Sequence, residues 1–276
     1  MIHQEIHLNQ YYPLSNDPIL EINIPHFLDC AFEKLPLSRA MIILPGGGYE
    51  FLSRREADPV VSAFLAGEYS CFTLWYTTHA AYPVPQAEMM AAVDFIRSHA
   101  EKLRIDPKAI CAIGFSAGGH LGASYAMLER SEELKKNLGI LSHDTDLNAL
   151  VLSYPVITMG KDTHQGTRNV ITGGKEELIE FLSVEKHVTK NYPPTFLWAT
   201  EEDHDVPVVN TVMMAESLRK AKVPYQCILY PHLWHGLSLA TERLNPIGYQ
   251  ENRDDFLLNA TWLDHALKFL SAVLKR

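Results

Sequence analysis

The chain has 276 residues, 47% of them hydrophobic, and its formal net charge is −9. A chain of this length can bury one large core, so we expect a single domain over residues 1–276. The acidic balance and the lack of any run of Lys and Arg argue against nucleic acid and anionic membranes as partners.

The first residues show no basic segment followed by an apolar one, as a signal peptide would. No apolar run approaches the roughly 18 residues of a spanning helix. The cysteines, Cys30, Cys71, Cys111 and Cys227, are scattered, and no pair has the spacing of metal ligands. We therefore expect a cytoplasmic protein with buried, reduced thiols and without a metal or cofactor.

The first 38 residues are predicted to form a β lead-in to the main fold. Residues 2–8 and 19–24 alternate apolar and polar side chains, as half-buried strands do. From residue 39 onward, short apolar runs alternate with helical segments, and such runs are typical of parallel strands covered on both faces. The runs are Met41–Leu44, Cys71–Tyr76, Ile110–Phe115, Ala149–Tyr154, Thr195–Thr200 and Tyr225–Tyr230.

The segments between these runs, together with the C-terminal segment, are predicted to be helices. The last of them places Leu263, Leu267, Leu270 and Leu274 on one apolar stripe that can dock on a sheet. Strands that alternate with helices indicate an α/β fold, with a mostly parallel, doubly wound sheet of about eight strands flanked by helices. The predicted helices are 56–66, 86–100, 117–130, 208–221 and 260–274.

Residues 155–194 interrupt this alternation, because their periodicity is weak and they contain several Gly, Thr and Pro. Long irregular connections in compact domains are often functional lids. Two interpretations stay open for this segment: a short lid, or a surface excursion with one helix near Glu176–Leu182.

The strongest motif is Gly-Phe-Ser-Ala-Gly at residues 114–118, between a predicted strand and a predicted helix. A Gly-x-Ser-x-Gly turn in this setting strains the serine backbone and holds the hydroxyl clear of the sheet. Side chains at Gly114 and Gly118 would clash across so tight a turn. The helix N-terminus adds free N–H groups and a positive dipole end. The motif therefore predicts that Ser116 is a nucleophile.

A glycine-rich loop follows the predicted strand Met41–Leu44, with Pro45 ahead of three glycines, residues 46–48, and then Tyr49. Backbone N–H groups in such a loop can stabilise the negative charge of a tetrahedral intermediate. A phosphate cradle is the rival interpretation, but the patterns Gly-x-x-x-x-Gly-Lys and Gly-x-Gly-x-x-Gly are both absent. We therefore predict an oxyanion-stabilising loop.

A serine hydroxyl is a weak nucleophile until a positioned imidazole takes its proton. In enzymes with this turn, the order along the chain is serine, acid, histidine. Among the 13 histidines, His235 lies in the loop after the last predicted strand and precedes Gly236, which suits a tight turn. We predict His235 as the base, with His232 of the same loop as the alternative.

The acid is expected after the preceding strand, Thr195–Thr200, where an acidic loop of residues 201–207 follows. A carboxylate there would accept the imidazole N–H, fix its tautomer and stabilise the imidazolium. Asp203 is the first choice, because three residues separate it from the segment that leads into the next helix. Asp205 and Glu202 stay open as alternatives.

These motifs resemble those of the bacterial acetyl esterases of the α/β-hydrolase fold, which are often linked with xylan breakdown. These esterases are similar to the feruloyl-esterase-like and hormone-sensitive-lipase-like groups. The resemblance implies a Ser116, Asp203 and His235 triad, and an oxyanion hole made by the N–H groups of Ala117 and of Gly47 or Gly48. The matching segments are Pro45–Tyr49, residues 114–121, Ser153–Pro155, Pro194–Phe196, residues 203–210 and His235–Ser238.

Two positions depart from the lipase-like pattern. A histidine usually stands where this chain has Pro45, and an arginine usually follows the tyrosine at position 76, where this chain has Thr77. The first departure changes the bracing of the glycine loop but leaves its backbone donors in place. The second removes the contacts that the arginine would make.

The motifs and the resemblance predict a serine esterase that removes small acyl groups, acetyl above all, from a soluble saccharide or similar alcohol through an acyl-enzyme. A small acyl group is favoured because no large cap segment precedes the nucleophile motif. Tyr49 and Trp234 are predicted to offer stacking faces to a sugar, with Trp75 and Trp198 as further candidates. The expected partner is a small-molecule ester, and a homo-oligomer stays open.

Three other functions compete with this prediction. A peptidase of the prolyl-oligopeptidase kind shares the triad order, but usually carries a propeller domain that this length cannot hold. A non-catalytic ligand-binding protein of the same fold is disfavoured by the full set of triad candidates. A metal-dependent deacetylase could use His204, His232 and His235, but no helix carries His-Glu-x-x-His.

Overall fold

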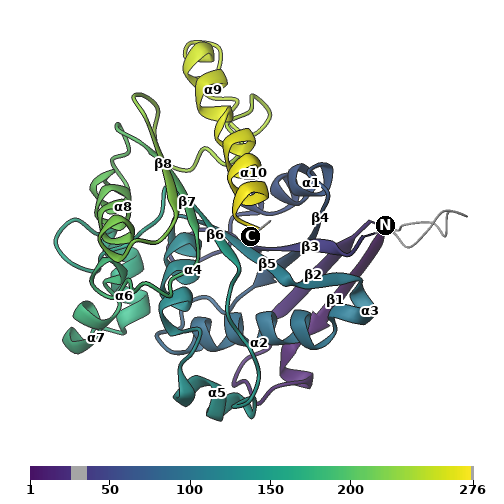
Figure 1. Ribbon diagram of the computed structural model, residues 1–276. Coiled ribbons are helices and arrows are strands. Elements are labelled where there is room, and N and C mark those ends of the chain that lie inside the picture. Colours follow the sequence, from purple (N-terminus) through teal and green to yellow (C-terminus); the bar gives the residue numbers. More distant parts are fainter. Residues whose placement is uncertain (26–35, 275–276) are drawn as a thin grey trace, which may run out of the picture.

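A twisted β-sheet with helices on both faces forms the centre of the molecule (Figure 1). The computed structural model describes residues 1–25 and 36–274, and in these residues the sheet has eight strands. The strands are β1 Ile2–His7, β2 Ile19–Ile24, β3 Ser38–Leu44, β4 Tyr69–Trp75, β5 Ile105–Phe115, β6 Ala149–Ser153, β7 Thr195–Thr200 and β8 Tyr225–Tyr230.

The strand order is β1-β2-β4-β3-β5-β6-β7-β8. Strand β2 pairs antiparallel with β1 and with β4, whereas the remaining neighbours are parallel. The predicted mostly parallel α/β sheet is therefore confirmed, and strands β1 and β2 lie within the predicted β lead-in.

Most strand boundaries lie close to the predicted ones, but the start of β5 and the burial of β8 differ from the prediction. Strand β5 begins at Ile105 rather than Ile110, because Ile105 pairs with Ser38 ahead of a register shift. The residues between Ile105 and Ile110 do not form a continuous apolar run, so the sequence pattern did not indicate this extension. Strand β8 has the predicted bounds but is mostly half-buried, because it lies at the edge of the sheet.

Side chains of β3 alternate between two hydrophobic cores, one on each face of the sheet. The helices that cover these faces and connect the strands are α1 Asp58–Ala66, α2 Val84–Ser98, α3 Ala100–Leu103, α4 Ala117–Leu128, α5 Glu132–Leu138, α6 Gln165–Thr172, α7 Glu176–Phe181, α8 Val209–Ala221, α9 Arg253–Ala260 and α10 Trp262–Val273. Ile42 and Leu44 belong to the core covered by α2, α4 and α8, and Met41 and Ile43 belong to the core covered by α1 and α10.

The predicted helices are present, with corrected ends. The predicted helix 56–66 begins later, at Asp58, because residues Arg54–Glu56 form a separate 3₁₀ turn. The predicted helix 260–274 corresponds to α10, and α9 precedes it. On the predicted leucine stripe, Leu270 is fully buried, whereas Leu263 and Leu267 are partly buried against the same core.

The segment 155–194 contains α6, α7 and a 3₁₀ turn, Val184–Lys186. The helix expected near Glu176–Leu182 is thus present as α7. Ile171 and Leu182 are fully buried, so this segment contributes to the core as well as to the surface. Whether any part of it acts as a lid stays a prediction.

Cys71 and Cys111 are free and buried, and Cys227 is free and half-buried on β8, whereas Cys30 lies outside the described residues. Within residues 1–25 and 36–274, no helix combines the length and the apolar character that crossing a membrane requires.

Candidate active site

Ser116 lies at the turn between β5 and α4, where the chain leaves the centre of the sheet. Its φ of 52° and ψ of −118° fall in a region that residues with a side chain rarely adopt. Two backbone hydrogen bonds stabilise this conformation: Ser116 N–H donates to the Ser153 carbonyl at 3.0 Å, and Val156 N–H donates to the Ser116 carbonyl at 3.1 Å. The strained backbone of Ser116 is therefore held by hydrogen bonds at both its N–H and its carbonyl group.

The two glycines of the motif are required by close backbone contacts. A Cβ atom at Gly114 would lie 2.2 Å from the Gly118 carbonyl oxygen, and one at Gly118 would lie 2.2 Å from the Leu44 carbonyl oxygen. Either side chain would push apart the turn, the helix and the neighbouring strand β3. This agrees with the tight turn predicted from the sequence.

The structure brings Ser116, His235 and Asp203 together at the carboxyl ends of β5, β8 and β7. His235 Nε2 lies 2.8 Å from Ser116 Oγ, and His235 Nδ1 lies 2.6 Å from Asp203 Oδ2. Because a carboxylate only accepts, Nδ1 carries the proton and Nε2 is free to accept the serine proton.

Asp203 is held in place by its own loop. Its side chain is fully buried, and Oδ1 accepts the N–H groups of Asp205 at 3.0 Å and Val206 at 2.8 Å. Of the two alternative acids, Glu202 bonds His232 Nδ1 and the Leu233 N–H on the exposed side of the loop. Asp205 lines the cavity, but within the described residues its carboxylate makes no hydrogen bond to His235. The geometry thus favours Asp203 and His235 over Asp205, Glu202 and His232.

The surroundings of His235 change its pKa in opposing ways. Burial alone would lower the pKa of the imidazole, but the hydrogen bond to Asp203 and the charges of Asp203, Glu56 and Asp205 raise it above 6.5. The net effect is a raised pKa, because these carboxylates stabilise the imidazolium. A base of this kind is suited to taking a proton and holding the resulting charge.

The glycine loop after β3 has the backbone conformation that glycine allows. Gly47 has a φ of 130°, and a Cβ atom there would lie 2.1 Å from the Phe51 carbonyl oxygen. In the part of the chain that the structure describes, the N–H groups of Gly47 and Gly48 donate to no protein atom. Ala117 is the first residue of α4, where an N–H has no acceptor within the helix. All three predicted oxyanion donors are therefore unoccupied by protein acceptors in the described residues.

A cavity of about 460 Å³ lies over Ser116 and His235, within the usual size range of small-molecule sites. Its wall includes Gly47, Gly48 and Arg55. The cavity therefore joins the nucleophile, the base and the glycine loop in one space.

Two of the predicted sugar-stacking residues do not reach this space. The Tyr49 ring is fully buried, and its hydroxyl lies 2.9 Å from His120 Nδ1. Trp198 is also fully buried, between the rings of Tyr154 and Trp262. A stacking face needs an exposed ring, so these two predictions are wrong.

The other two aromatic candidates reach the surface to different degrees. Trp75 is half-buried and lies under the Arg54 guanidinium, 4.5 Å from the ring centroid. Trp234 is 41% exposed and lines a cavity of about 280 Å³. Arg55 lines both this cavity and the one over Ser116, so Trp234 lies beside the catalytic space.

Sequence reasoning missed two buried polar residues near the site. His120 is fully buried, and burial lowers the pKa of its imidazole to about 4. Glu56 lines the cavity and is 5% exposed, and burial raises the pKa of its carboxyl. His120 lies two residues after the nucleophile motif, which was a usable signal, whereas Glu56 stands in a run of charged residues that looks like a solvated surface.

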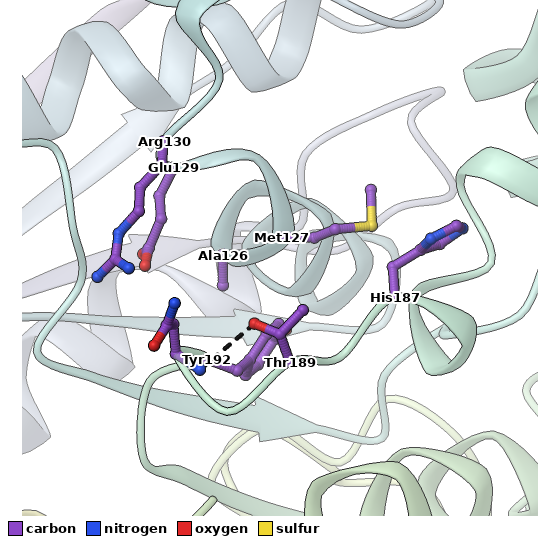
Figure 2. Close-up of a pocket in the computed structure, with 8 residues that line it drawn as sticks. Ala126, Met127, Glu129, Arg130, His187, Thr189 and Tyr192 are labelled. Carbon is purple, nitrogen blue, oxygen red and sulfur yellow. Dashed lines mark hydrogen bonds between the residues drawn. The ribbon is translucent and has the colours of Figure 1, made fainter. Parts of the chain in front are cut away.

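A smaller cavity of about 90 Å³ lies at the C-terminal end of α4, as Figure 2 shows. Glu129 and Arg130 project at one end of it and His187 at the other. Burial raises the pKa of the Glu129 carboxyl to about 8. No serine is among its lining residues, so this cavity does not repeat the arrangement around Ser116.

A strained serine at a strand-to-helix turn, bonded to a histidine that is bonded to a buried aspartate, defines the class of the protein. On a mostly parallel sheet, this arrangement is that of the serine hydrolases of the α/β-hydrolase fold. Residues 31–218 match the BD-FAE family, and the chain belongs to this family. The predicted resemblance to acetyl and feruloyl esterases of this fold is confirmed.

The names of two relatives of similar sequence refer to xylan or its esters. The chain is 36% identical to endo-1,4-beta-xylanase B of Butyrivibrio fibrisolvens over 73% of its own length and 33% of that protein. It is 26% identical to an acetylxylan esterase of Xylanibacter ruminicola, over 77% of its length and 44% of that protein. The chain thus spans less than half the length of either relative.

A solved structure matches over nearly the whole chain. It is the acetyl ester-xyloside bifunctional hydrolase from Caldicellulosiruptor lactoaceticus, with a TM-score of 0.81 and 28% identity. The match covers 98% of this chain and 96% of that one. The similarity therefore includes the β lead-in and the C-terminal helices as well as the central sheet.

Proposed function

We propose that this chain is a serine carboxylic-ester hydrolase that removes small acyl groups, in particular acetyl, from a soluble saccharide. The observation that carries the proposal is the contact of 2.8 Å between Ser116 Oγ and His235 Nε2, backed by Asp203. The names of the xylanase, the acetylxylan esterase and the acetyl ester-xyloside hydrolase support a saccharide ester as substrate.

The geometry supports a two-step reaction. His235 Nε2 takes the proton of Ser116 Oγ, and the oxygen attacks the ester carbonyl carbon. The carbonyl oxygen becomes an oxyanion, which the N–H groups of Gly47, Gly48 and Ala117 stabilise. The carbon–oxygen bond to the alcohol then breaks, the alcohol leaves with the proton from Nε2, and the acyl group stays on Ser116.

Water completes the cycle. His235 takes a proton from a water molecule that attacks the acyl carbonyl, and the carboxylic acid leaves as Ser116 recovers its proton. Asp203 accepts the Nδ1–H in both steps, which keeps the tautomer and stabilises the imidazolium. The carboxylate itself does not need to be protonated at any stage.

The surroundings of the glycine loop support a small acyl group. His164 Cε1 lies 3.5 Å from the position that a Cβ atom of Gly48 would occupy. This imidazole is fixed, because its Nδ1 accepts the N–H of Thr167 at the start of α6. The space next to the oxyanion donors is therefore limited by α6 on that side.

The exposed ring of Trp234 supports a saccharide as the alcohol. The ring packs edge-to-face with Phe256, with centroids 5.5 Å apart, and also touches Gly248. An apolar ring face fixed at the rim of a polar cavity suits a sugar, which has an apolar face and polar edges. Arg55 lines both the cavity over Ser116 and the cavity beside Trp234, and its guanidinium can donate to sugar hydroxyls.

The test is a substrate panel measured with the wild-type chain and Ser116→Ala. The panel contains p-nitrophenyl esters of graded acyl length and acetylated xylo-oligosaccharides. We expect acetate to be hydrolysed faster than butyrate and longer esters, and turnover in Ser116→Ala to fall by a factor on the order of 10⁴ or more. Full esterase activity in Ser116→Ala would contradict the proposal.

Two competing functions would each give a different experimental result. Faster cleavage of peptide amides than of esters would point to a peptidase of the prolyl-oligopeptidase kind. Failure of a fluorophosphonate probe to label Ser116 would point to a non-catalytic binding protein. We expect stoichiometric labelling that is lost in Ser116→Ala.

A further inference from the structure

Glu56 is a buried carboxylate that connects two loops of the active site. It ends the 3₁₀ turn Arg54–Glu56, and its side chain reaches the cavity over Ser116. We propose that Glu56 is a positioning residue, which ties the oxyanion loop to the loop of His235 and holds both in reactive geometry. The inference rests on the proposed function, because it concerns the same reaction at Ser116.

The first connection is to the oxyanion loop. The Gly46 N–H donates to Glu56 Oε2 at 2.8 Å, which fixes the orientation of this peptide group. A Cβ atom at Gly46 would lie 2.8 Å from Glu56 Oε2 and 2.9 Å from Ser116 Cβ, so carboxylate, loop and nucleophile are in close contact. Since the Gly46 N–H is occupied, the loop presents the N–H groups of Gly47 and Gly48 to the substrate.

The second connection leads to the loop of His235. The Tyr154 hydroxyl donates to Glu56 Oε1 at 2.8 Å and accepts the Ser238 N–H at 2.9 Å. The Tyr154 ring also lies edge-on against the imidazole of His235, with centroids 4.9 Å apart. Ser238 follows His235 by three residues, so the chain of hydrogen bonds ends on the loop that carries the base.

A parallel contact strengthens this connection. The Ser238 hydroxyl donates to the Arg55 carbonyl at 2.6 Å, directly beside Glu56 in the sequence. The turn Arg54–Glu56 is therefore bound to the loop of His235 at two points, one through a backbone carbonyl and one through the carboxylate. A shift of either loop would break hydrogen bonds between groups that are buried or half-buried.

The charge of Glu56 has a role beyond geometry. Both hydrogen bonds to the carboxylate come from donors, which suits the ionised form. The charges of His235 and Arg55 also favour that form, against the effect of burial. A negative charge here stabilises the imidazolium of His235, in the same direction as Asp203.

Three variants separate geometry from charge. Glu56→Gln keeps the shape and removes the charge, and Glu56→Ala removes both hydrogen bonds. Tyr154→Phe removes the hydroxyl that bonds both Glu56 and Ser238, and leaves the contact between Glu56 and the Gly46 N–H in place. Glu101→Gln is the control, because Glu101 is an exposed carboxylate on α3. Hydrolysis of p-nitrophenyl acetate is measured across pH, and rates are divided by the active-site concentration from fluorophosphonate titration.

We expect Glu56→Gln to move the acid limb of kcat/KM to lower pH, because the imidazolium loses a stabilising charge. Glu56→Ala should lower kcat per active site about tenfold or more, with KM little changed, as the oxyanion donors lose their orientation. Tyr154→Phe should give a smaller loss, and Glu101→Gln should match the wild type. A carboxylate that served only folding would lower the number of active sites without moving the pH profile.

The results separate a failure of this inference from a failure of the proposed function. Wild-type kcat per active site and an unmoved acid limb in both Glu56 variants would overturn the inference and leave the proposed function intact. If Glu56→Ala does not fold, the pH profile of Glu56→Gln decides. A wild-type chain that hydrolyses no ester would overturn the proposed function and this inference with it.

Discussion

The Tyr49 hydroxyl donates a hydrogen bond of 2.9 Å to His120 Nδ1, which connects the oxyanion loop to the first turn of α4. His120 Nε2 lies 3.0 Å from the Leu182 carbonyl, and because a carbonyl only accepts, Nε2 carries the proton. The imidazole is therefore neutral and uses both nitrogens, in agreement with a pKa lowered to about 4 by burial. The loop, the helix and the segment after α7 meet at this one side chain.

Tyr49→Phe tests whether this tyrosine supports structure rather than binding substrate. The change leaves His120 Nδ1 without its donor, in a fully buried position. We expect the free energy of unfolding to fall by about 1–3 kcal/mol, measured by urea denaturation, while KM for all esters stays unchanged. A raised KM for saccharide esters alone, with unchanged stability, would restore Tyr49 as a substrate contact.

The pH dependence of activity reports the state of His235. Protonated imidazole cannot take the proton of Ser116, so kcat/KM should fall as pH drops through the pKa of His235. Because carboxylates around the imidazole raise this pKa, we expect the midpoint of the acid limb above pH 6.5 in the free enzyme. A midpoint clearly below that value would contradict the raised pKa.

Asp203→Asn removes the carboxylate that bonds His235 Nδ1. We expect kcat to fall by a factor on the order of 10⁴, because the imidazole loses its preferred tautomer. Glu202→Gln is the matched control, since Glu202 is exposed in the same loop and bonds His232 instead. A larger loss in Glu202→Gln than in Asp203→Asn would reverse the choice of acid.

The sequence was informative where function follows from order along the chain. Ser116, Asp203 and His235 each lie in the turn or loop that follows a parallel strand, and the carboxyl ends of such strands share one edge of a sheet. Strand periodicity and chain order were therefore enough to predict which three side chains meet. The choice of Asp203 over Asp205 depended on loop conformation, which only the structure describes.

The residues that sequence reasoning missed or misplaced have partners far away in the chain. Tyr49 and His120 are 71 positions apart, and Glu56 and Tyr154 are 98 apart. No local pattern in the sequence records such pairs. The sequence therefore placed Tyr49 near the active site as an aromatic side chain, and Glu56 at the start of a predicted helix. Trp198 was misplaced for a related reason, because a tryptophan in an apolar run packs against helices such as α10 that lie distant in sequence.

Glu129 should make the stability of the chain depend on pH in an unusual direction. Its carboxyl has a pKa of about 8 in the folded chain and near 4.5 in the unfolded chain. The folded state therefore keeps a proton that the unfolded state loses, and the free energy of unfolding falls as pH rises from about 4.5 to about 8.

Glu129→Gln tests this dependence, because the amide imitates the protonated acid and can still accept the Leu147 N–H. We expect the variant to be more stable than the wild type at pH 8.5 by at least about 1 kcal/mol, and nearly equal to it at pH 5. Urea denaturation at both pH values measures the difference, with Glu101→Gln as the control. An equal gain at both pH values would mean that ionisation of Glu129 is not its source.

Trp234→Ala separates binding of the saccharide from the chemistry at Ser116. Loss of a stacking ring removes about 1 kcal/mol of binding, which corresponds to a KM about fivefold higher for acetylated xylo-oligosaccharides. The ring lies outside the cavity over Ser116, so kcat and the hydrolysis of p-nitrophenyl acetate should stay unchanged. Trp234→Phe keeps an aromatic face and should recover most of the affinity. If KM for the oligosaccharide stays at the wild-type value in Trp234→Ala, the sugar does not stack on this ring, and the alcohol must be bound elsewhere on the cavity rim.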